Sequence, residues 1–246
     1  MSFRTALIVQ ARMGSSRLPG KVLLEVLGKT LLEYQIERLR LSREIDQIII
    51  ATTTLKMDNP IVSLCEKLGV AYFRGSSDDV LSRYYEAGKI SCADIIVRCN
   101  SDCPLIDAKV VDRVICAFKD EAPLYAYVSN ILSPTYPTGF HTEAFSINAL
   151  EAAFENAHQA EEREHVTPYI YRNPQIFNLL NIAIDRDLSK IRLTIDYPED
   201  FKVVTKIIEG LYPANPKFDM DDMLKFLDLN PEILKINSQF TKKATV

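Results

Sequence analysis

Short apolar runs alternate with amphipathic helical patterns along the first half of this chain, and this alternation constrains the fold more than any other feature. Between successive runs, apolar residues recur three or four positions apart, as Leu32, Ile36 and Leu39 do, which is typical of helices packed on a core. Strands separated by helices predict βαβ units, and right-handed crossovers place helices on both faces of a mostly parallel sheet. The expected fold class is therefore α/β. The predicted strands are residues 6–9, 47–51, 70–73, 94–98 and 124–129.

A second region interrupts this alternation. Residues 133–190 begin with closely spaced prolines and then carry a predicted helix at about 147–157 and a predicted strand at 177–184. We interpret this region as an insertion or subdomain placed within the sheet-forming part of the chain.

The alternating pattern returns after the insertion. Leu193 and Ile195 share one face of a predicted strand at 192–196, and a further helix follows it. We therefore expect one domain over residues 1–236, followed by a polar, frayed tail over residues 237–246.

The composition excludes several classes of function. The chain has 29 Lys and Arg against 33 Asp and Glu, a formal net charge of −4, so no nucleic-acid partner is expected and any anion must bind at a local cationic site. Five cysteines form no regular framework, which favours a reducing compartment. Without a signal peptide or an apolar run of membrane-spanning length, we expect a cytoplasmic protein with no membrane association.

A cationic loop follows the first predicted strand. It runs from Arg12 to Lys21 and combines three cations with two glycines and two serines, a set that lets backbone N–H groups and side chains surround an anion. A nucleoside triphosphate is the expected ligand. Five residues separate Gly14 from Gly20, and Val22 stands where a P-loop carries the hydroxyl that binds Mg²⁺. Any metal ligands must come from elsewhere in the chain. The alternative is an ordinary basic surface loop.

Two carboxylates are the expected metal ligands. Open parallel sheets bind ligands beyond the carboxyl ends of their strands, and Asp102 and Asp196 both lie at such ends in this prediction. Mg²⁺ is usually held by one or two carboxylates together with substrate phosphates. The alternatives are a turn residue before Pro104 and a helix N-cap before Pro198.

Other polar residues on the same rim are candidates for binding a second substrate. Arg98 could meet a phosphate or a carboxylate, or it could simply be a solvated strand end. Glu164 and His165 begin a predicted helix, where capping and surface packing are the alternatives. No nucleophile elbow, dinucleotide-binding or zinc-protease motif is present. The candidates are Arg98, His141, Glu143, Glu164 and His165.

Five segments, in order over roughly residues 5 to 205, resemble the cytidylyltransferases that activate acidic sugars. These are the CMP-Kdo and CMP-acylneuraminate synthetases and, with the nearest pattern, the branch of spore-coat polysaccharide synthesis. Five ordered matches are more specific than any single motif. The matching segments are RMGSSRLPGK at 12–21, GSSDDVLSRYY at 75–85, DCPLID at 102–107, REHVTPY at 163–169 and RLTIDYPED at 192–200.

The resemblance implies a Rossmann-like nucleotidyltransferase fold, CTP as the donor and Mg²⁺ as the cofactor. At the matched positions it implies that Asp102 and Asp196 hold Mg²⁺ and that Ser77 and Arg83 lie near the nucleoside. The residues that it implies around the triphosphate are Arg12, Met13, Gly14, Ser15, Arg17 and Lys21.

The resemblance also bears on the acceptor and on the assembly. Residues 137–143 differ from the common form of the family, which has acidic residues at positions 138 and 141, and Asn100-Ser101 stands where the branch often has Thr-Gly. A homodimer built from the insertion is implied, and aromatic residues are enriched in such interfaces. The aromatic residues expected there are Tyr136, Phe140, Phe145, Tyr169, Tyr171 and Phe177.

These features predict an enzyme that moves CMP from CTP to an acidic sugar or a related acceptor, with release of pyrophosphate. An acceptor hydroxyl attacks the α-phosphate, while Arg17 and Lys21 neutralise charge on the leaving pyrophosphate. The alternatives are a nucleotide-sugar-dependent glycosyltransferase and a non-catalytic nucleotide-binding partner in polysaccharide biosynthesis.

Overall fold

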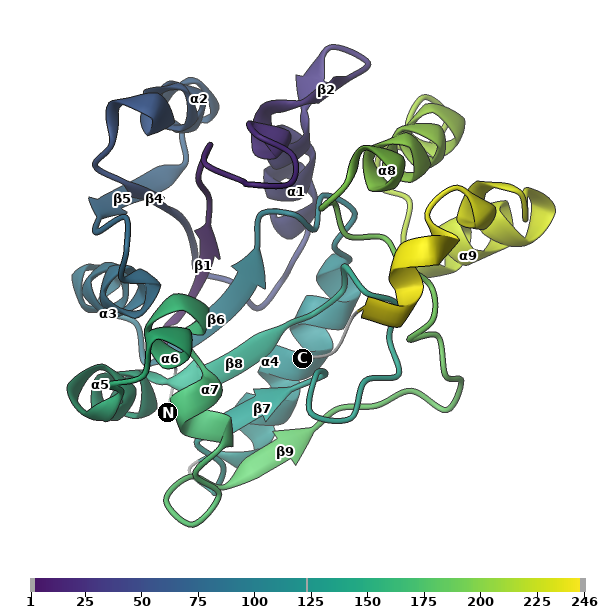
Figure 1. The fold of residues 1–246 in the computed structure, drawn as a ribbon. Coiled ribbons are helices and arrows are strands. Elements are labelled where there is room, and N and C mark those ends of the chain that lie inside the picture. The colour runs from purple at the N-terminus through teal and green to yellow at the C-terminus, as the bar shows by residue number, and fades with distance from the viewer. Residues whose placement is uncertain (1–2, 123, 244–246) are drawn as a thin grey trace.

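The computed structural model describes residues 3–122 and 124–243, and a central sheet with helices on both faces dominates it (Figure 1). In spatial order its strands are β5 (Ala71–Gly75), β4 (Gln47–Thr53), β1 (Thr5–Gln10), β6 (Ile95–Asn100), β8 (Glu143–Ser146), β7 (Tyr127–Ser129) and β9 (Leu179–Asn181). β1 is parallel to β4 and β6, β4 to β5, and β7 to β9, whereas β8 runs antiparallel to both neighbours. The α/β class with a mostly parallel sheet is therefore confirmed.

The two faces of the sheet follow from the two-residue repeat of its strands. Leu7 and Val9 of β1 face a core shared with one group of helices, and Ala6 and Ile8 face a core shared with another. Figure 1 shows α4 behind the sheet and α6 in front of it. The first group is α1 (Leu31–Leu39), α2 (Asn59–Leu68) and α4 (Ala108–Glu121); the second is α3 (Val80–Ser91), α5 (Ile147–Asn156) and α7 (Pro168–Tyr171). The short helix α6 (Ala160–His165) joins the start of α3 through an ion pair between Arg163 and Asp79.

A third apolar cluster lies beside the sheet. It joins α8 (Pro198–Leu211) and α9 (Met220–Leu229) to the start of α1 and to the hairpin of β2 (Glu25–Val26) and β3 (Lys29–Thr30). The described residues also form short 3-10 helices, which are η1 (Lys21–Leu23), η2 (Lys56–Asp58), η3 (Ile233–Lys235) and η4 (Ser238–Lys243). Among the described residues no helix is long and apolar enough to cross a membrane.

The predicted insertion, residues 133–190, contributes to the sheet itself. Its strand β8 inserts between β6 and β7, and its helices pack on the same core as α3. The expectation that its six aromatic residues would face a partner is wrong for four of them, because they are buried within their own chain. These four are Tyr136, Phe140, Phe145 and Phe177.

The predicted strand at 192–196 is absent. Both edges of β6 are already taken, by β1 and β8, so this segment cannot pair with β6 as a further strand. It forms one isolated bridge, between Thr138 and Arg192, and the Ile195 N–H donates to the Asp102 carbonyl at 2.8 Å. The alternation of Leu193 and Ile195 is real, but it packs on the third apolar cluster instead. Asp196 therefore lies in a loop that crosses the end of β6.

The tail from residue 237 does not fray over its described part. Asn237 is almost completely buried, η4 follows it, and Phe240 stacks on Tyr197 with ring centroids 3.9 Å apart. In Figure 1 this yellow segment lies between the sheet and α9. The tail is polar in sequence, yet the described residues pack against the domain.

Candidate active site

A polar cavity of about 250 Å³ opens at the carboxyl ends of β1 and β6. The cationic loop, α3, α6 and the Asp196 loop surround it, so segments far apart in the sequence meet at one rim, as the parallel topology requires. Its polar lining residues are Gln10, Arg12, Ser15, Ser16, Arg17, Lys21, Arg83, Arg98, Asn100, Ser101, Asp102, Glu164, His165 and Asp196.

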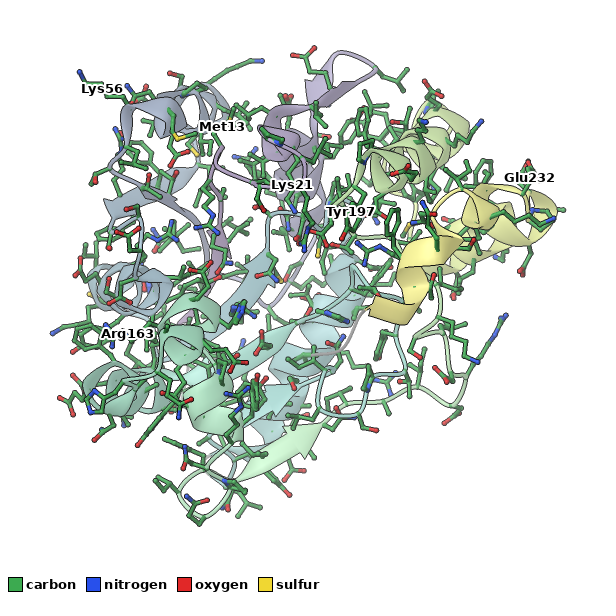
Figure 2. All side chains as sticks on the ribbon, viewed as in Figure 1. Met13, Lys21, Lys56, Arg163, Tyr197 and Glu232 are labelled. Atoms are coloured by element: carbon green, nitrogen blue, oxygen red, sulfur yellow. The ribbon has the colours of Figure 1, made fainter. Side chains whose placement is uncertain are left out.

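Lys21 is the centre of the charged part of this cavity. Its ammonium donates to Asp102 Oδ2 at 3.1 Å, to Asp196 Oδ1 at 3.0 Å and to the Ile195 carbonyl at 2.6 Å. Gly20, at φ 68°, turns the chain into η1 and so places Lys21 at the start of that short helix. Figure 2 shows Lys21 beside the loop that carries Tyr197.

Asp102 and Asp196, the two expected metal ligands, lie close together in the structure. Both carboxylates touch the same Lys21 ammonium, so they lie far closer than the roughly 10 Å beyond which one hydrated Mg²⁺ could not bridge them. The N-cap alternative for Asp196 does not hold, because Asp200 accepts from the backbone N–H of Tyr197, the N-cap residue of α8. The turn that Asp102 occupies is anchored instead by its carbonyl, which accepts from Ile195 and from the Thr194 hydroxyl.

Three cations surround Asp196. Arg17 Nη2 lies 2.6 Å from Oδ1, which Lys21 also contacts, and Arg192 Nη2 lies 3.0 Å from Oδ2. Burial on its own would raise the pKa of Asp196. The nearby Lys21 charge and the hydrogen bonds from Arg17, Lys21 and Arg192 outweigh burial and lower that pKa from 3.8 to about 2.

This shift predicts a measurable acid sensitivity. A carboxyl whose pKa is lower in the folded state stabilises the protein above its unfolded pKa, and that stability is lost as pH falls through the folded value. Between pH 4 and pH 2 the wild type should therefore lose about 2 kcal/mol more unfolding free energy than Asp196→Asn does. Urea unfolding at the two pH values measures the difference, and equal losses in the two proteins would contradict the ion cluster.

Arg83 lies in the wall of the cavity with no compensating partner. It is 2% exposed, its Nε and Nη1 atoms have no hydrogen-bond partner in the described structure, and burial lowers its pKa. Its aliphatic part crosses Gly75, where a Cβ would come within 2.7 Å of Arg83 Cγ. A buried guanidinium with free donors is costly unless a ligand accepts from it, so Arg83 is placed to meet a bound group.

Arg98 and Glu143 form a buried pair beneath the same cavity. Arg98 lines the cavity from β6, and Glu143, from β8, lies directly opposite it in the antiparallel register. Glu143 also accepts from the Tyr127 hydroxyl at 2.7 Å and from the Thr167 hydroxyl at 2.5 Å. Glu143 does not line the cavity, and its carboxylate is occupied by these contacts. It therefore orients Arg98, and the expectation that it binds an acceptor directly is corrected.

An uncommon backbone turn brings the α6 end to the cavity. Val166 has φ 73° and ψ −57°, and the Thr167 N–H donates to the His165 carbonyl at 2.9 Å, which is a γ-turn of the rare positive-φ form. A β-branched residue held in this region costs about 1–3 kcal/mol. The turn lets His165 line the cavity while Thr167 reaches Glu143. Glu164 and His165 thus end α6, whereas the sequence pattern predicted that they begin a helix.

Several predicted site residues lie outside the cavity lining. The Met13 N–H donates to Asp58 Oδ1 at 2.7 Å, which anchors the cationic loop to η2, and Gly14 packs near Met57. The Ser77 hydroxyl donates to Asp78 at 3.0 Å. His141 is also absent from the lining, and burial lowers its pKa, which favours the neutral imidazole. The remaining predicted residues around the triphosphate, Arg12, Ser15, Arg17 and Lys21, do line the cavity.

Other lining residues were not predicted. Gln10 and Asn100 are cross-strand neighbours on β1 and β6, and Gln10 Oε1 and Asn100 Oδ1 are buried without a partner in the described structure. Their position at the ends of two apolar runs was the signal available in the sequence. Arg192 and Asp200 were also missed as supports of Asp196, although they belong to one of the five matching segments.

The donor set suits a magnesium ion that also binds phosphate. Within the described ranges no group of three or more His, Cys, Asp or Glu side chains forms a ready-made metal centre. Two convergent carboxylates are sufficient for Mg²⁺, because it commonly keeps several waters and takes its other ligands from substrate phosphates. Asp102 and Asp196 therefore fit such an ion, provided that Lys21 moves away from them.

A parallel sheet with a cationic loop and two convergent carboxylates at its carboxyl rim defines a protein of the nucleotidyltransferase fold. Comparison with known proteins specifies it further. The chain matches the model of the cytidylyltransferase family over residues 6–225, and it belongs to that family. It is therefore a CTP-dependent nucleotidyltransferase, and the expected family and enzyme class are confirmed.

Individual relatives agree with this assignment. The chain is 41% identical to the uncharacterized protein MJ1063 of Methanocaldococcus jannaschii, over 96% of both chains. It is 30% identical to the spore coat polysaccharide biosynthesis protein SpsF of Bacillus subtilis, over 92% of this chain and 94% of SpsF.

Solved structures show the same fold. A cytidylyltransferase from Leptospira borgpetersenii superposes with a TM-score of 0.91 at 34% identity, covering 95% of this chain and 97% of that one. The CMP:2-keto-3-deoxy-manno-octonic acid synthetase solved in complex with CTP has a TM-score of 0.66 at 16% identity, covering 84% of this chain and 99% of that one. The second likeness is evidence for the fold alone.

Proposed function

We propose that this enzyme transfers CMP from CTP to an acidic sugar at the cavity beside Lys21. The observation that carries the proposal is the meeting of Lys21 and Arg17 with two carboxylates at the carboxyl rim of the sheet. The acceptor hydroxyl oxygen forms a bond to the α-phosphorus, the bond from that phosphorus to the bridging oxygen breaks, and pyrophosphate leaves. The hydroxyl proton passes to solvent water as the new ester forms.

The cationic loop binds the triphosphate in this proposal. Arg12, Arg17 and Lys21 line the cavity and are able to donate to phosphate oxygens, with Ser15 adding a hydroxyl. Lys21 and Arg17 stabilise the negative charge that moves onto the leaving pyrophosphate, which is the role expected of preorganised donors. Positioning accounts for most of the remaining catalysis, because the chain needs to form no covalent intermediate.

Asp102 and Asp196 hold Mg²⁺ in this proposal. The ion, when bound, draws charge from the phosphoryl oxygens and fixes their orientation. The contribution of the chain is to aim both carboxylates at one point, which their shared contact with Lys21 supports, and to keep Asp196 ionised, which its low pKa supports.

The acceptor binds beside Arg98 and His165 in this proposal. Both residues line the cavity, and Arg98 Nε is buried without a partner in the described residues. A guanidinium is well suited to a carboxylate, the group that distinguishes an acidic sugar from a neutral one. Arg83 is then left for the nucleoside. The identity of the Bacillus subtilis relative supports a place in polysaccharide synthesis, in the cytoplasm where nucleotides are made.

A pyrophosphate-release screen tests this function. The four common nucleoside triphosphates are each combined with a panel of keto sugar acids and neutral sugars, with Mg²⁺ present. We expect release with CTP and a carboxylate-bearing acceptor, and none with the neutral counterpart. Release only from nucleotide sugars, as nucleoside diphosphate, would indicate a glycosyltransferase, and no release with any combination would favour a non-catalytic role.

A homodimer stays a prediction, now placed at the far edge of the sheet. β9 is an edge strand, and the nearby Ile176 is 60% exposed while Leu124 is 58% exposed. Aromatic burial no longer supports the interface, since Tyr136 and Phe177 belong to the core of one chain. Light scattering at micromolar concentration should give twice the mass of 27.9 kDa. A monomeric mass would contradict the prediction, and Ile176→Lys should convert a dimer to a monomer if this edge is the interface.

A further inference from the structure

The C-terminal segment contacts, through one buried side chain, the groups that hold Asp196 from behind. Asn237 is 1% exposed, and its Nδ2 donates both to the Arg192 carbonyl at 3.1 Å and to Asp200 Oδ1 at 2.9 Å. An amide placed between two acceptors satisfies both of them, and neither contact is local, since 45 and 37 residues separate the partners in sequence.

Asp200 carries this contact to the Asp196 loop. It is completely buried, and its Oδ2 accepts from the backbone N–H of Asp196 at 2.9 Å and of Tyr197 at 3.0 Å. Both of its oxygens also accept from the Arg192 guanidinium at 2.9 Å. Asp200 therefore fixes the backbone from which the Asp196 side chain projects.

Arg192 holds the Asp196 side chain itself. The Nη2 atom that contacts Asp200 also donates to Asp196 Oδ2 at 3.0 Å. Because Oδ2 is held in this way, Oδ1 is the oxygen that faces Lys21 and Arg17. The direction of the Asp196 carboxylate is thus set by buried groups behind it.

A second contact from the same segment supports the neighbouring residue. Phe240 stacks on Tyr197 with an angle of 6° between the rings, and the Arg17 guanidinium lies 5.4 Å from the centre of the Tyr197 ring. Through Asn237 the segment therefore contacts Arg192 and Asp200, which hold Asp196. Through Phe240 it contacts Tyr197, whose ring lies beside the Arg17 guanidinium.

We propose that the C-terminal segment supports the active site, with Asn237 as a positioning residue that aims Asp196 through Asp200 and Arg192. The inference rests on the proposed role of Asp196 as a metal ligand. Asn237 itself does not line the cavity. Its contacts make the C-terminal segment a fixed support for the Asp196 carboxylate.

Hydrogen exchange tests the positioning directly. In Asn237→Ala the amides of Asp196 and Tyr197 should exchange at least tenfold faster than in the wild type, because Asp200 loses the amide that holds it. The matched control is Asn230→Ala, which also removes an asparagine contact to a backbone carbonyl, that of Phe226 at 2.8 Å, but does not touch Asp200. Asn237→Ser, which keeps a donor, serves if the alanine variant does not fold. Unchanged exchange at these two amides would overturn the proposal.

Metal binding tests the consequence for the site. Mn²⁺, followed by its electron paramagnetic resonance signal in the presence of CTP, should bind about tenfold more weakly to Asn237→Ala than to the wild type or to Asn230→Ala. If the Asp196 and Tyr197 amides exchanged faster in Asn237→Ala but its Mn²⁺ affinity were unchanged, the proposed effect of Asn237 on metal binding would be refuted. If the wild type bound no Mn²⁺ with CTP, the proposed metal role would fail, while the exchange result would still decide whether Asn237 positions Asp196.

Discussion

Replacement of Lys21 by alanine should lower the rate of pyrophosphate release by a hundredfold or more. Loss of one preorganised charge-stabilising donor has effects of this size, because no solvent group takes its place during the reaction. Lys21 is also the group that joins Asp102 to Asp196, so its loss leaves two neighbouring carboxylates without their shared cation. Steady-state assay of pyrophosphate release with saturating CTP measures the effect.

The control for this variant is Lys29→Ala. Lys29 is also paired, with Glu37, and donates to the Tyr212 hydroxyl at 2.8 Å, but it lies on the hairpin away from the cavity. It should retain nearly full turnover. A correctly folded Lys21→Ala variant with wild-type turnover would rule out the proposed role of the ammonium.

The second large effect is expected from the two carboxylates. Asp102→Asn and Asp196→Asn should each reduce Mg²⁺-dependent turnover by a thousandfold or so, since an amide keeps the shape but removes a charged oxygen ligand. Asparagine serves as a helix cap as well as aspartate does, so a capping role alone predicts active variants. The measurements are turnover at several Mg²⁺ concentrations and circular dichroism to confirm that the fold persists.

Asp46→Asn provides the matched control for both variants. Asp46 accepts from the Thr5 N–H at 2.7 Å, at the opposite end of β1, and an asparagine oxygen could accept the same bond. Its turnover should be unchanged. Full activity in either of the two site variants would mean that the metal, if required, binds elsewhere.

The fold was predictable where periodicity and burial agree. The apolar runs of β1, β4 and β6 are long and are flanked by helical stripes, so each could be located from the sequence alone. β8 could not, because it has four residues and one of them is a buried glutamate whose partner Arg98 comes from another strand. The segment at 192–196 was wrongly predicted to be a strand. An alternating apolar pattern indicates that one face of a segment is buried, but it does not show that the segment pairs within a sheet.

The candidate site was predictable where one local motif carries the chemistry. The loop from Arg12 to Lys21 was located because cations and glycines cluster within ten residues. Supports that act across the fold left no such pattern. The Val166 turn has a positive φ without a glycine to signal it, and Asn237 looks in sequence like any polar residue of a terminus.

The pairing of Lys21 with both carboxylates has a consequence for how ligands enter. The free site is a closed set of ion pairs, in which Arg17, Lys21 and Arg192 balance Asp102, Asp196 and Asp200. A triphosphate that draws Lys21 away would leave Asp102 and Asp196 without their shared cation and facing its own negative charge, and a divalent cation arriving alone would have to expel the ammonium. Binding of each ligand therefore raises the affinity for the other, and thermodynamic linkage requires that the two affinities rise by the same factor. The triphosphate and the divalent cation should therefore bind cooperatively.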